Sequence, residues 1–276
     1  MLAPLVTTEW LKSQINDPNL IILDASMSDN KSGDTADLTD VRIKNARFFD
    51  LKKSFSDKDS SLPNMLPEED SYTVACQALG INADSLIVVY DNLGIYTSPR
   101  VWWMFKAMGH DNIAVLDGGI PKWVKEGLPT EPIQEVTYPK GTFRAKFRPN
   151  MVKNAGNILH NLKQNEAIVI DARSSGRFCG TEPEPRKELK GGHIPGSLNL
   201  PYTEVIKAGQ FLPKEDLKQV FEDLKLGGRP LVFSCGSGLT ACIILLASEL
   251  VQKNPTAVYD GSWTEWGQLE DVPIAT

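Results

Sequence analysis

The chain repeats one sequence pattern, and this internal duplication constrains its fold more than any other feature. Four anchor segments recur in the same order in the two halves: residues 21–26 and 168–173, 42–46 and 193–197, 86–91 and 230–235, and 115–119 and 258–262. The offsets between the paired segments are 147, 151, 144 and 143 residues, so their drift is small. A chain of 276 residues is long enough for two domains of roughly 100–200 residues each. The sequence therefore predicts two copies of one fold, at residues 1–130 and 151–276.

Each copy alternates short runs of β-branched apolar residues with longer amphipathic stretches. This alternation is typical of parallel strands joined by helical crossovers, and it predicts an α/β fold. Residues 87–90 and 231–234 are the expected central strands. The helices after them are expected at 101–108 and 241–250, with Thr240 capping the second. Residues 131–150 contain three prolines and a glycine without a helical period, and are predicted as the linker.

The composition excludes several classes of function. Lys and Arg total 29 against 35 Asp and Glu, a net charge of −6, so no general basic field exists to attract nucleic acid or an anionic membrane. The longest apolar run, residues 241–247, is far shorter than the ~20 residues of a membrane-spanning helix. The N-terminus has no basic residue before its short apolar stretch, which argues against a secretory signal. Four cysteines without a CxxC pair predict reduced thiols in a cytoplasmic protein and no bound metal.

The strongest candidate for chemistry is SCGSGLTA, residues 234–241, between an expected strand and an expected helix. Two glycines within four residues allow the backbone to turn with its N–H groups directed inward. The N-terminus of the following helix would stabilise an anionic thiolate at this point. The nucleophile is expected to be Cys235, and the backbone donors around it are expected to be Gly236, Gly238, Leu239 and Thr240.

Two other interpretations of this segment stay open. Cys235 can be a small buried side chain beside a turn, since cysteine is commonly buried. A cysteine phosphatase also uses a loop between a strand and a helix, but that loop must end in an arginine that binds the phosphate, and position 241 is alanine. The segment contains no lysine either. An uncharged loop favours a small, weakly charged group such as a thiol sulfur.

Essentially the whole chain resembles the 3-mercaptopyruvate sulfurtransferases of the rhodanese superfamily. The resemblance rests on CGSGLTAC (235–242), SPRVWWMFKAMGH (98–110), VLDGGIPKW (115–123), DARSSGRFCGTEPEPR (171–186), GHIPGS (192–197) and YDGSWTEWG (259–267). It implies two tandem rhodanese domains, each a small, mainly parallel sheet flanked by helices on both faces. It also implies that the N-terminal copy is inactive and the C-terminal copy catalytic, and the first copy has Asp91 where the second has Cys235.

The resemblance implies roles for individual residues around this cysteine. Arg177 and Arg186 are the expected ligands of the substrate carboxylate and carbonyl, because the planar guanidinium suits an α-keto acid. Arg100, from the first copy, is expected either to face the same cleft or to form an ion pair between the domains. Ser237 is the expected hydrogen-bond partner and proton donor of the substrate.

The first copy departs from the family at one position. Related enzymes use an acid and a histidine of that copy in a relay with the loop serine, but the place expected to read HIPGA begins with Arg42. Either the relay is dispensable, or Arg42 adds positive potential that holds Cys235 as a thiolate. His193 is expected to be structural, Cys242 to lie in the core and Cys76 in a helix over residues 73–79, while Cys179 is expected to be exposed and sensitive to oxidation.

These residues together predict a sulfurtransferase without an organic cofactor. Cys235 attacks the sulfur of 3-mercaptopyruvate, pyruvate leaves, and the cysteine persulfide passes its outer sulfur to cyanide or to a thiol such as thioredoxin. One alternative is a thiosulfate:cyanide sulfurtransferase, but members of that group resemble one another in having cationic loop residues where this chain has Gly236 and Ser237. The other alternative is a non-catalytic persulfide carrier or binding module, which would not need the paired Arg177 and Arg186.

Overall fold

The computed structural model describes residues 2–28 and 36–276, and the chain divides into two compact units. Unit 1 contains Met1–Lys58, Leu66–Arg148 and Ala208–Phe211. Unit 2 contains Asp59–Met65, Pro149–Lys207 and Leu212–Thr276. Each unit therefore includes one short segment from the other half of the sequence. The duplication pattern did not predict either of these two exchanged segments.

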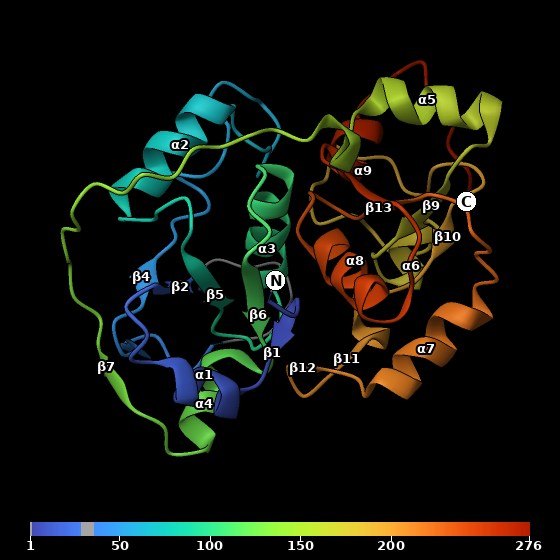
Figure 1. Ribbon diagram of the computed structural model, residues 1–276. Coiled ribbons are helices and arrows are strands. Elements are labelled where there is room, and N and C mark those ends of the chain that lie inside the picture. Colours follow the sequence, from blue (N-terminus) through green and yellow to red (C-terminus); the bar gives the residue numbers. More distant parts are fainter. Residues whose placement is uncertain (1, 29–35) are drawn as a thin grey trace. The chain divides into compact units, whose positions relative to one another are not determined.

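Unit 1 is a parallel five-stranded sheet flanked by helices (Figure 1). Its elements are β1 (Leu5–Val6), α1 (Thr8–Gln14), β2 (Leu20–Asp24), β3 (Val41–Ile43), β4 (Arg47–Phe48), α2 (Glu69–Ala78), β5 (Leu86–Tyr90), α3 (Ser98–Ala107), β6 (Ile113–Leu116), α4 (Gly119–Lys125), β7 (Thr130–Pro132) and β12 (Gln210–Phe211). The strand order is β1-β6-β5-β2-β4, and every neighbouring pair is parallel. The strand expected at residues 87–90 is thus confirmed as β5 in the middle of the sheet.

Unit 2 repeats this topology. Its elements are a 3-10 helix (Pro149–Met151), β8 (Val152–Lys153), α5 (Ala155–Gln164), β9 (Ile168–Asp171), α6 (Ser175–Phe178), β10 (Leu198–Asn199), a second 3-10 helix (Tyr202–Glu204), β11 (Ile206–Lys207), α7 (Lys214–Asp223), β13 (Leu231–Ser234), α8 (Thr240–Val251), β14 (Thr256–Tyr259) and α9 (Ser262–Trp266). The order β10-β9-β13-β14-β8 is again entirely parallel. Strand for strand it matches β4-β2-β5-β6-β1, so the predicted duplication of an α/β fold is confirmed.

Helix α8 packs in the core of unit 2. Eight consecutive residues, 241–248, are buried, as expected of a helix that is apolar all round. The expectation that Thr240 caps this helix is wrong, because Thr240 is its first residue and Leu239 occupies the cap position without a side-chain hydrogen bond. The first N–H groups of α8 therefore receive no side-chain cap, and they stay available to a group that lies in front of the helix.

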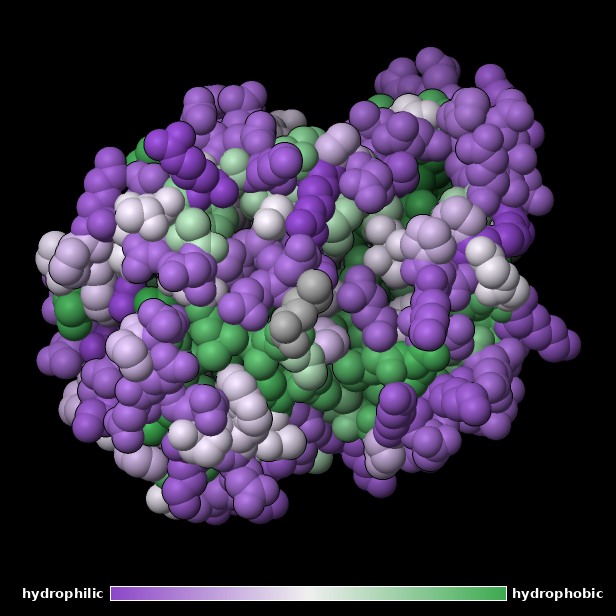
Figure 2. Space-filling view, viewed as in Figure 1, coloured by the Kyte–Doolittle hydropathy of each residue, from purple (hydrophilic) through white to green (hydrophobic). Residues whose placement is uncertain are grey.

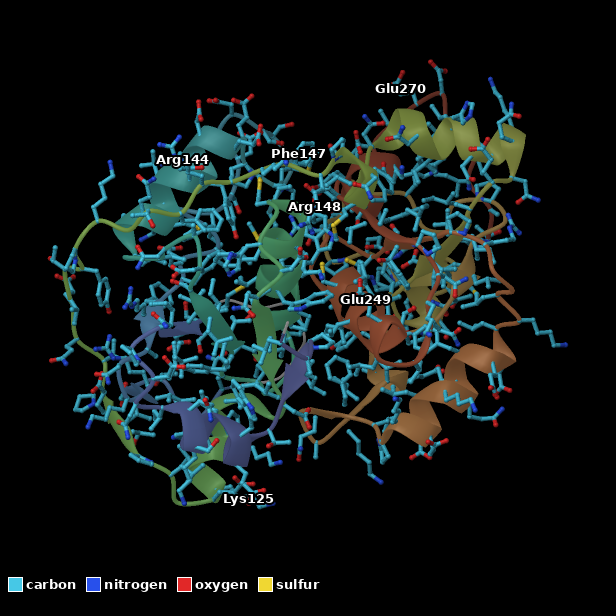
Figure 3. The ribbon with its side chains drawn as sticks, in the orientation of Figure 1. Lys125, Arg144, Phe147, Arg148, Glu249 and Glu270 are labelled. Carbon is cyan, nitrogen blue, oxygen red and sulfur yellow. The ribbon has the colours of Figure 1, made fainter. Side chains whose placement is uncertain are left out.

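The segment predicted as a linker is attached to unit 1 over most of its length. Phe143 is 1 % exposed and packs against the rings of Tyr72 and Phe105. Further along the segment, Arg148 donates two hydrogen bonds to Asp111, of 2.8 and 2.7 Å. Figure 3 labels Arg148 at the end of this extended stretch. Because unit 1 includes the chain through Arg148, little of the predicted linker is left between the two units.

Hydrophilic residues cover most of the face in Figure 2. Among the residues that the structure describes, no helix combines the length and the apolar character needed to cross a membrane.

Candidate active site

Cys235 follows β13 directly, and the residues after it lead into the N-terminus of α8. It is 1 % exposed, and its backbone is held by α9. The Cys235 N–H donates to Ser262 Oγ at 3.2 Å, and Trp263 N–H donates to the Cys235 carbonyl at 2.9 Å. Thr264 then donates to the Gly236 carbonyl through both its N–H, at 2.9 Å, and its hydroxyl, at 2.6 Å. The segment YDGSWTEWG thus fixes the loop, a role that its sequence did not reveal.

The loop turns so that its N–H groups lie in front of α8. Gly238 has φ of +78°, a conformation that glycine adopts without steric cost. Within the described part of the chain, the N–H groups of Ser237, Thr240 and Ala241 have no protein acceptor. Such a cluster of open donors at a helix N-terminus binds an anion.

Unit 1 shows what the same loop does when its cysteine position holds an acid. Asp91 is fully buried, and its Oδ2 accepts hydrogen bonds from the N–H groups of Tyr96, Thr97 and Ser98, at 2.9, 3.0 and 2.9 Å. Its Oδ1 accepts from Leu93 N–H at 2.9 Å, and the Ser98 hydroxyl adds a bond of 2.7 Å. The carboxylate of Asp91 therefore occupies the anion cradle of unit 1.

The comparison identifies the cradle donors in unit 2. At the offset of 144 residues, Leu93, Tyr96 and Thr97 correspond to Ser237, Thr240 and Ala241, whose N–H groups are among the open ones of the loop. Cysteine has a shorter side chain than aspartate and no oxygen atoms to fill the space. The cradle of unit 2 can therefore stabilise an anionic sulfur on Cys235, or a substrate atom bound to it.

Arg177 lies directly beside this loop. It belongs to α6, whose cap residue Ser174 accepts a hydrogen bond from the Arg177 N–H at 3.4 Å. A β-carbon on Gly236 would come within 3.1 Å of Arg177 Nη2, so the guanidinium packs against the loop where glycine leaves room. One edge of the guanidinium is bound by Glu184, with Nε–Oε1 of 3.2 Å and Nη2–Oε2 of 2.6 Å.

Glu184 links Arg177 to a buried ion network, and neither it nor Arg173 was singled out from the sequence. Arg173 donates from Nη1 to Glu184 at 2.8 Å and from Nη2 to Asp171 at 2.7 Å. Burial alone lowers the pKa of Arg173, but the carboxylates of Asp171 and Glu184 raise it, and the net shift is upward. The Arg173 guanidinium also lies 4.2 Å from the ring centre of Trp263. This network gives Arg177 a fixed orientation.

Arg186 approaches the loop from another direction. Its Nη1 donates to the Thr264 hydroxyl at 3.1 Å, and that hydroxyl donates to the Gly236 carbonyl. Arg177 therefore packs against Gly236 directly, whereas Arg186 is connected to Gly236 through the Thr264 hydroxyl. The binding of a substrate carboxylate by these two arginines stays a prediction.

Ser237 has a partner that the sequence did not reveal. Asn64 donates from Nδ2 to both the carbonyl and the hydroxyl oxygen of Ser237, each at 3.2 Å. Asn64 lies in the segment Asp59–Met65, which belongs to unit 2, and has a left-handed φ of +60°. The sequence placed the departure from the family relay at Arg42, whereas the residue in contact with Ser237 is Asn64.

Arg42 and Arg100 are both buried in unit 1. Arg42 is 5 % exposed and donates from Nε to Glu131 at 2.8 Å and from Nη1 to the Gln134 carbonyl at 3.1 Å. The Arg100 guanidinium lies 4.4 Å from the ring centre of Trp103. The electrostatic role of Arg42 and the substrate contact of Arg100 stay predictions.

The structure confirms the core position of Cys242, the exposure of Cys179 and the helix around Cys76. Cys76 and Cys242 are buried, and Cys179 is exposed. His193 Nδ1 lies 2.9 Å from the Phe178 carbonyl, and the two rings stack at 3.8 Å. The described ranges 2–28 and 36–276 contain no group of three or more His, Cys, Asp or Glu side chains arranged to hold a metal ion.

Comparison with known proteins places these features in a family. A model of the rhodanese-like domain matches residues 7–126 and 154–269. A 3-mercaptopyruvate sulfurtransferase of Escherichia coli K12 is 36 % identical over 98 % of this chain and 96 % of its own length. A relative from Arabidopsis thaliana, named thiosulfate/3-mercaptopyruvate sulfurtransferase 1, mitochondrial, is 39 % identical over 98 % of this chain and 78 % of its own.

Solved structures agree with the sequence comparisons. The crystal structure of SseA from E. coli, described as a 3-mercaptopyruvate sulfotransferase with the rhodanese fold, has a TM-score of 0.82 and 35 % identity, covering 95 % of this chain and 99 % of that one. The Tum1 protein of Saccharomyces cerevisiae has a TM-score of 0.85 and 30 % identity, covering 96 % and 95 %.

Proposed function

The chain belongs to the rhodanese family, and we propose that it transfers the sulfur of 3-mercaptopyruvate through a persulfide on Cys235 to cyanide or a thiol. The observation that carries this proposal is the anion cradle around Cys235, three of whose N–H groups have no acceptor among the described protein groups. In unit 1 the corresponding N–H groups donate hydrogen bonds to the carboxylate of Asp91, so this loop conformation suits a negatively charged group. In unit 2 it surrounds the one side chain that can act as a nucleophile at this position.

The first half-reaction forms the persulfide. The thiolate of Cys235 attacks the sulfur of 3-mercaptopyruvate, so a sulfur–sulfur bond forms and the carbon–sulfur bond breaks. The electron pair of the broken bond becomes the enolate of pyruvate, which takes up one proton from Ser237 or water. The open N–H groups of the loop stabilise the outer sulfur of the persulfide. No redox cofactor is needed, because sulfur leaves the substrate without its bonding electron pair.

Arg177 and Arg186 hold the substrate and disperse the developing charge. An α-keto acid presents a carboxylate and a carbonyl oxygen side by side, which suits the fork of a guanidinium. Glu184 binds one edge of Arg177, so the other edge is directed to the substrate. When the enolate forms, negative charge moves onto the carbonyl oxygen, and the two guanidinium groups stabilise it.

In the second half-reaction an acceptor removes the outer sulfur. A thiolate or cyanide attacks that sulfur, the sulfur–sulfur bond breaks, and the electron pair returns to Cys235 as a thiolate. Thioredoxin is one thiol that can act in this way. We place the protein in the cytoplasm, which is reducing, because all four of its cysteines are free.

Replacing the nucleophile tests the mechanism directly. Cys235→Ser is expected to abolish pyruvate release from 3-mercaptopyruvate, because serine at neutral pH is a far weaker nucleophile than a thiolate. Intact-mass measurement of the wild-type protein after incubation with substrate alone should show the mass of one added sulfur atom, located on Cys235. Cys179→Ser, which removes an exposed thiol, serves as the matched control and should keep both properties. Retained turnover by Cys235→Ser would contradict the proposal.

Thiosulfate is the second candidate donor. The relative from Arabidopsis carries both donors in its name, but the loop around Cys235 has no cationic residue to meet a dianion. We therefore expect kcat/KM to be higher for 3-mercaptopyruvate than for thiosulfate, measured with cyanide as the common acceptor. The third candidate function is a persulfide carrier that another enzyme loads. It requires that Cys235 gains no sulfur in the intact-mass measurement with 3-mercaptopyruvate alone.

A further inference from the structure

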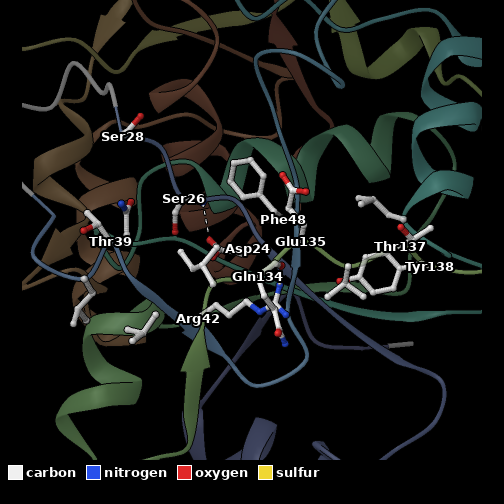
Figure 4. A pocket seen from close by; sticks show the side chains of 16 residues that line it. Asp24, Ser26, Ser28, Thr39, Arg42, Phe48, Gln134, Glu135, Thr137 and Tyr138 are labelled. Atoms are coloured by element: carbon white, nitrogen blue, oxygen red, sulfur yellow. Dashed lines mark hydrogen bonds between the residues drawn. The ribbon is translucent and has the colours of Figure 1, made fainter.

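Unit 1 contains a cavity of about 870 Å³ that the sulfur transfer reaction does not use. It opens at the end of β2 and is bounded by the segment after β7. Its polar lining includes Asp24, Ser26, Arg42 and Gln134, which Figure 4 shows around one space. The volume lies in the range of small-molecule sites, roughly 300–1,000 Å³.

Asp24 occupies the same position in unit 1 as Asp171 in unit 2. Each is the last residue of its strand, β2 or β9. The Ser26 N–H donates to Asp24 Oδ1 at 2.9 Å, and the Arg173 N–H donates to Asp171 Oδ1 at 3.0 Å. The backbone is therefore the same at both places, and Ser26 is the counterpart of Arg173.

The two positions differ in their compensating charge. In unit 2 the guanidinium of Arg173 binds Asp171 and has no exposed surface. In unit 1 the side chains of Ser26 and Tyr90 form hydrogen bonds with Asp24 but supply no cation, and among the described residues no basic side chain forms an ion pair with it. Asp24 is nevertheless only 5 % exposed, and its burial raises its pKa. A carboxylate buried without a counter-ion is unfavourable unless a positive group joins it.

The other residues that line the cavity also favour a ligand that carries a positive charge and has an apolar part. Among the described residues that line the cavity, the charged side chains are the carboxylates of Asp24 and Glu135 and the guanidinium of Arg42, which Glu131 already pairs. The mouth is apolar, because Phe48, Ile133 and Val136 line it and are large hydrophobic residues exposed by 52, 53 and 44 %. Exposed apolar side chains gathered at one cavity mark a binding surface.

We propose that this cavity binds a small organic cation, an amidinium, guanidinium or primary amine on an apolar body, with Asp24 as its counter-ion. The cationic group would take the place that the Arg173 guanidinium fills in unit 2. The apolar body would lie against Phe48, Ile133 and Val136. The proposal uses only residues of unit 1 and does not depend on the reaction at Cys235.

Calorimetric titration with two probes of the same shape tests the charge requirement. Benzamidine carries an amidinium on a ring, whereas benzamide is its uncharged counterpart. We expect the wild-type protein to bind benzamidine at least about tenfold more tightly than benzamide, the ratio for an ion pair that contributes about 1.4 kcal/mol. Asp24→Asn, which keeps the shape of the side chain, should abolish that difference. Glu135→Gln, at an exposed carboxylate of the same cavity, should retain it.

Ser26→Arg provides a second and independent variant. Its guanidinium would reach Asp24 from the same backbone position as Arg173 reaches Asp171, so it should exclude benzamidine. Pyruvate release by each variant reports whether the protein is folded, since neither position belongs to the catalytic site. Absence of benzamidine binding by the wild-type protein overturns the proposal, as does equal binding by Asp24→Asn. Unchanged binding by Ser26→Arg overturns the assigned position of the cation.

Discussion

Glu184 fixes the orientation of Arg177 beside the Cys235 loop. The bond between Arg177 Nη2 and Glu184 is 2.6 Å long, and the same carboxylate binds Arg173. A lysine at position 177 would keep the charge but lose the planar fork that binds Glu184 and that we propose binds the substrate. The role of Arg177 therefore depends on the geometry of its donors as well as on its charge.

Arg177→Lys is expected to raise KM for 3-mercaptopyruvate by about tenfold or more, because one bidentate contact with the substrate is lost. Steady-state kinetics with pyruvate detection measures this change. Arg144→Lys, at an exposed arginine of unit 1, is the matched control and should leave KM unchanged. An unaltered KM for Arg177→Lys would exclude a direct substrate contact.

Asn64 determines which way the Ser237 hydroxyl hydrogen can point. The Ser237 carbonyl only accepts hydrogen bonds, so the Asn64 group that contacts it must be the NH₂, and this group also donates to Ser237 Oγ. The hydroxyl hydrogen is consequently left to another acceptor, such as the substrate. A carboxylate in place of this amide would instead attract that hydrogen.

We therefore expect Asn64→Asp to lower kcat more than Asn64→Ala does, by about threefold to tenfold. Acidification that protonates the introduced carboxyl group should reduce the difference between the two variants. A pH profile of kcat for both variants measures this, and a merely structural role of Asn64 would leave their profiles parallel. Equal losses in the two variants at every pH would contradict the assignment.

At the scale of elements, one loop serves two purposes. Before α8 it surrounds Cys235, and before α3 it is closed by the carboxylate of Asp91. The anion cradle of unit 1 is thus a structural device, since its N–H groups would be unsatisfied without Asp91.

Asp91→Ala should destabilise unit 1 by about 2–4 kcal/mol, because it leaves several buried N–H groups without an acceptor. Denaturant unfolding measures the loss. Asp84→Ala, at an exposed carboxylate of unit 1 outside the loop, is the comparison variant and should cost far less. A loss for Asp91→Ala as small as that of the comparison would show that the carboxylate does not hold the loop.

At the scale of the whole molecule, the segment predicted as a linker, residues 131–150, is attached to unit 1 by charge as well as by apolar packing. The guanidinium of Arg148 lowers the pKa of Asp111 well below its usual range. The carboxyl group is thus ionised more readily in the folded protein than in the unfolded chain. Its contribution to stability is complete above the unfolded pKa of about 3.9 and disappears as the pH falls through the lower folded value.

Asp111→Asn is therefore expected to be less stable than the wild-type protein at pH 7, with the difference shrinking as the pH falls below about 4. The free energy of unfolding at several pH values measures this difference. Glu270→Gln, at an exposed carboxylate labelled in Figure 3, controls for the loss of one negative charge. A difference that is constant with pH would show that the ion pair with Arg148 does not act on the folded state.

The sequence by itself determined the duplication, the parallel α/β class and the family, and it supplied the proposed nucleophile Cys235 and the proposed substrate arginines, Arg177 and Arg186. These inferences follow from local patterns, because strand periodicity, glycines in a turn and a motif of neighbouring residues each involve only a short stretch of sequence. The contrast between Asp91 and Cys235 was also visible, because both residues occupy one place in a repeated pattern.

Only the tertiary structure decided how these residues are supported. Asn64 and Ser237 are 173 positions apart, and Arg186 and Thr264 are 78 apart, so no local pattern links them. The exchange of two short segments between the units and the attachment of the segment through Arg148 likewise arise from packing between distant parts of the chain. The uncompensated carboxylate of Asp24 became visible only when its surroundings were compared with those of Asp171. Such contacts depend on which surfaces meet when the chain folds, and the order of residues does not specify them locally.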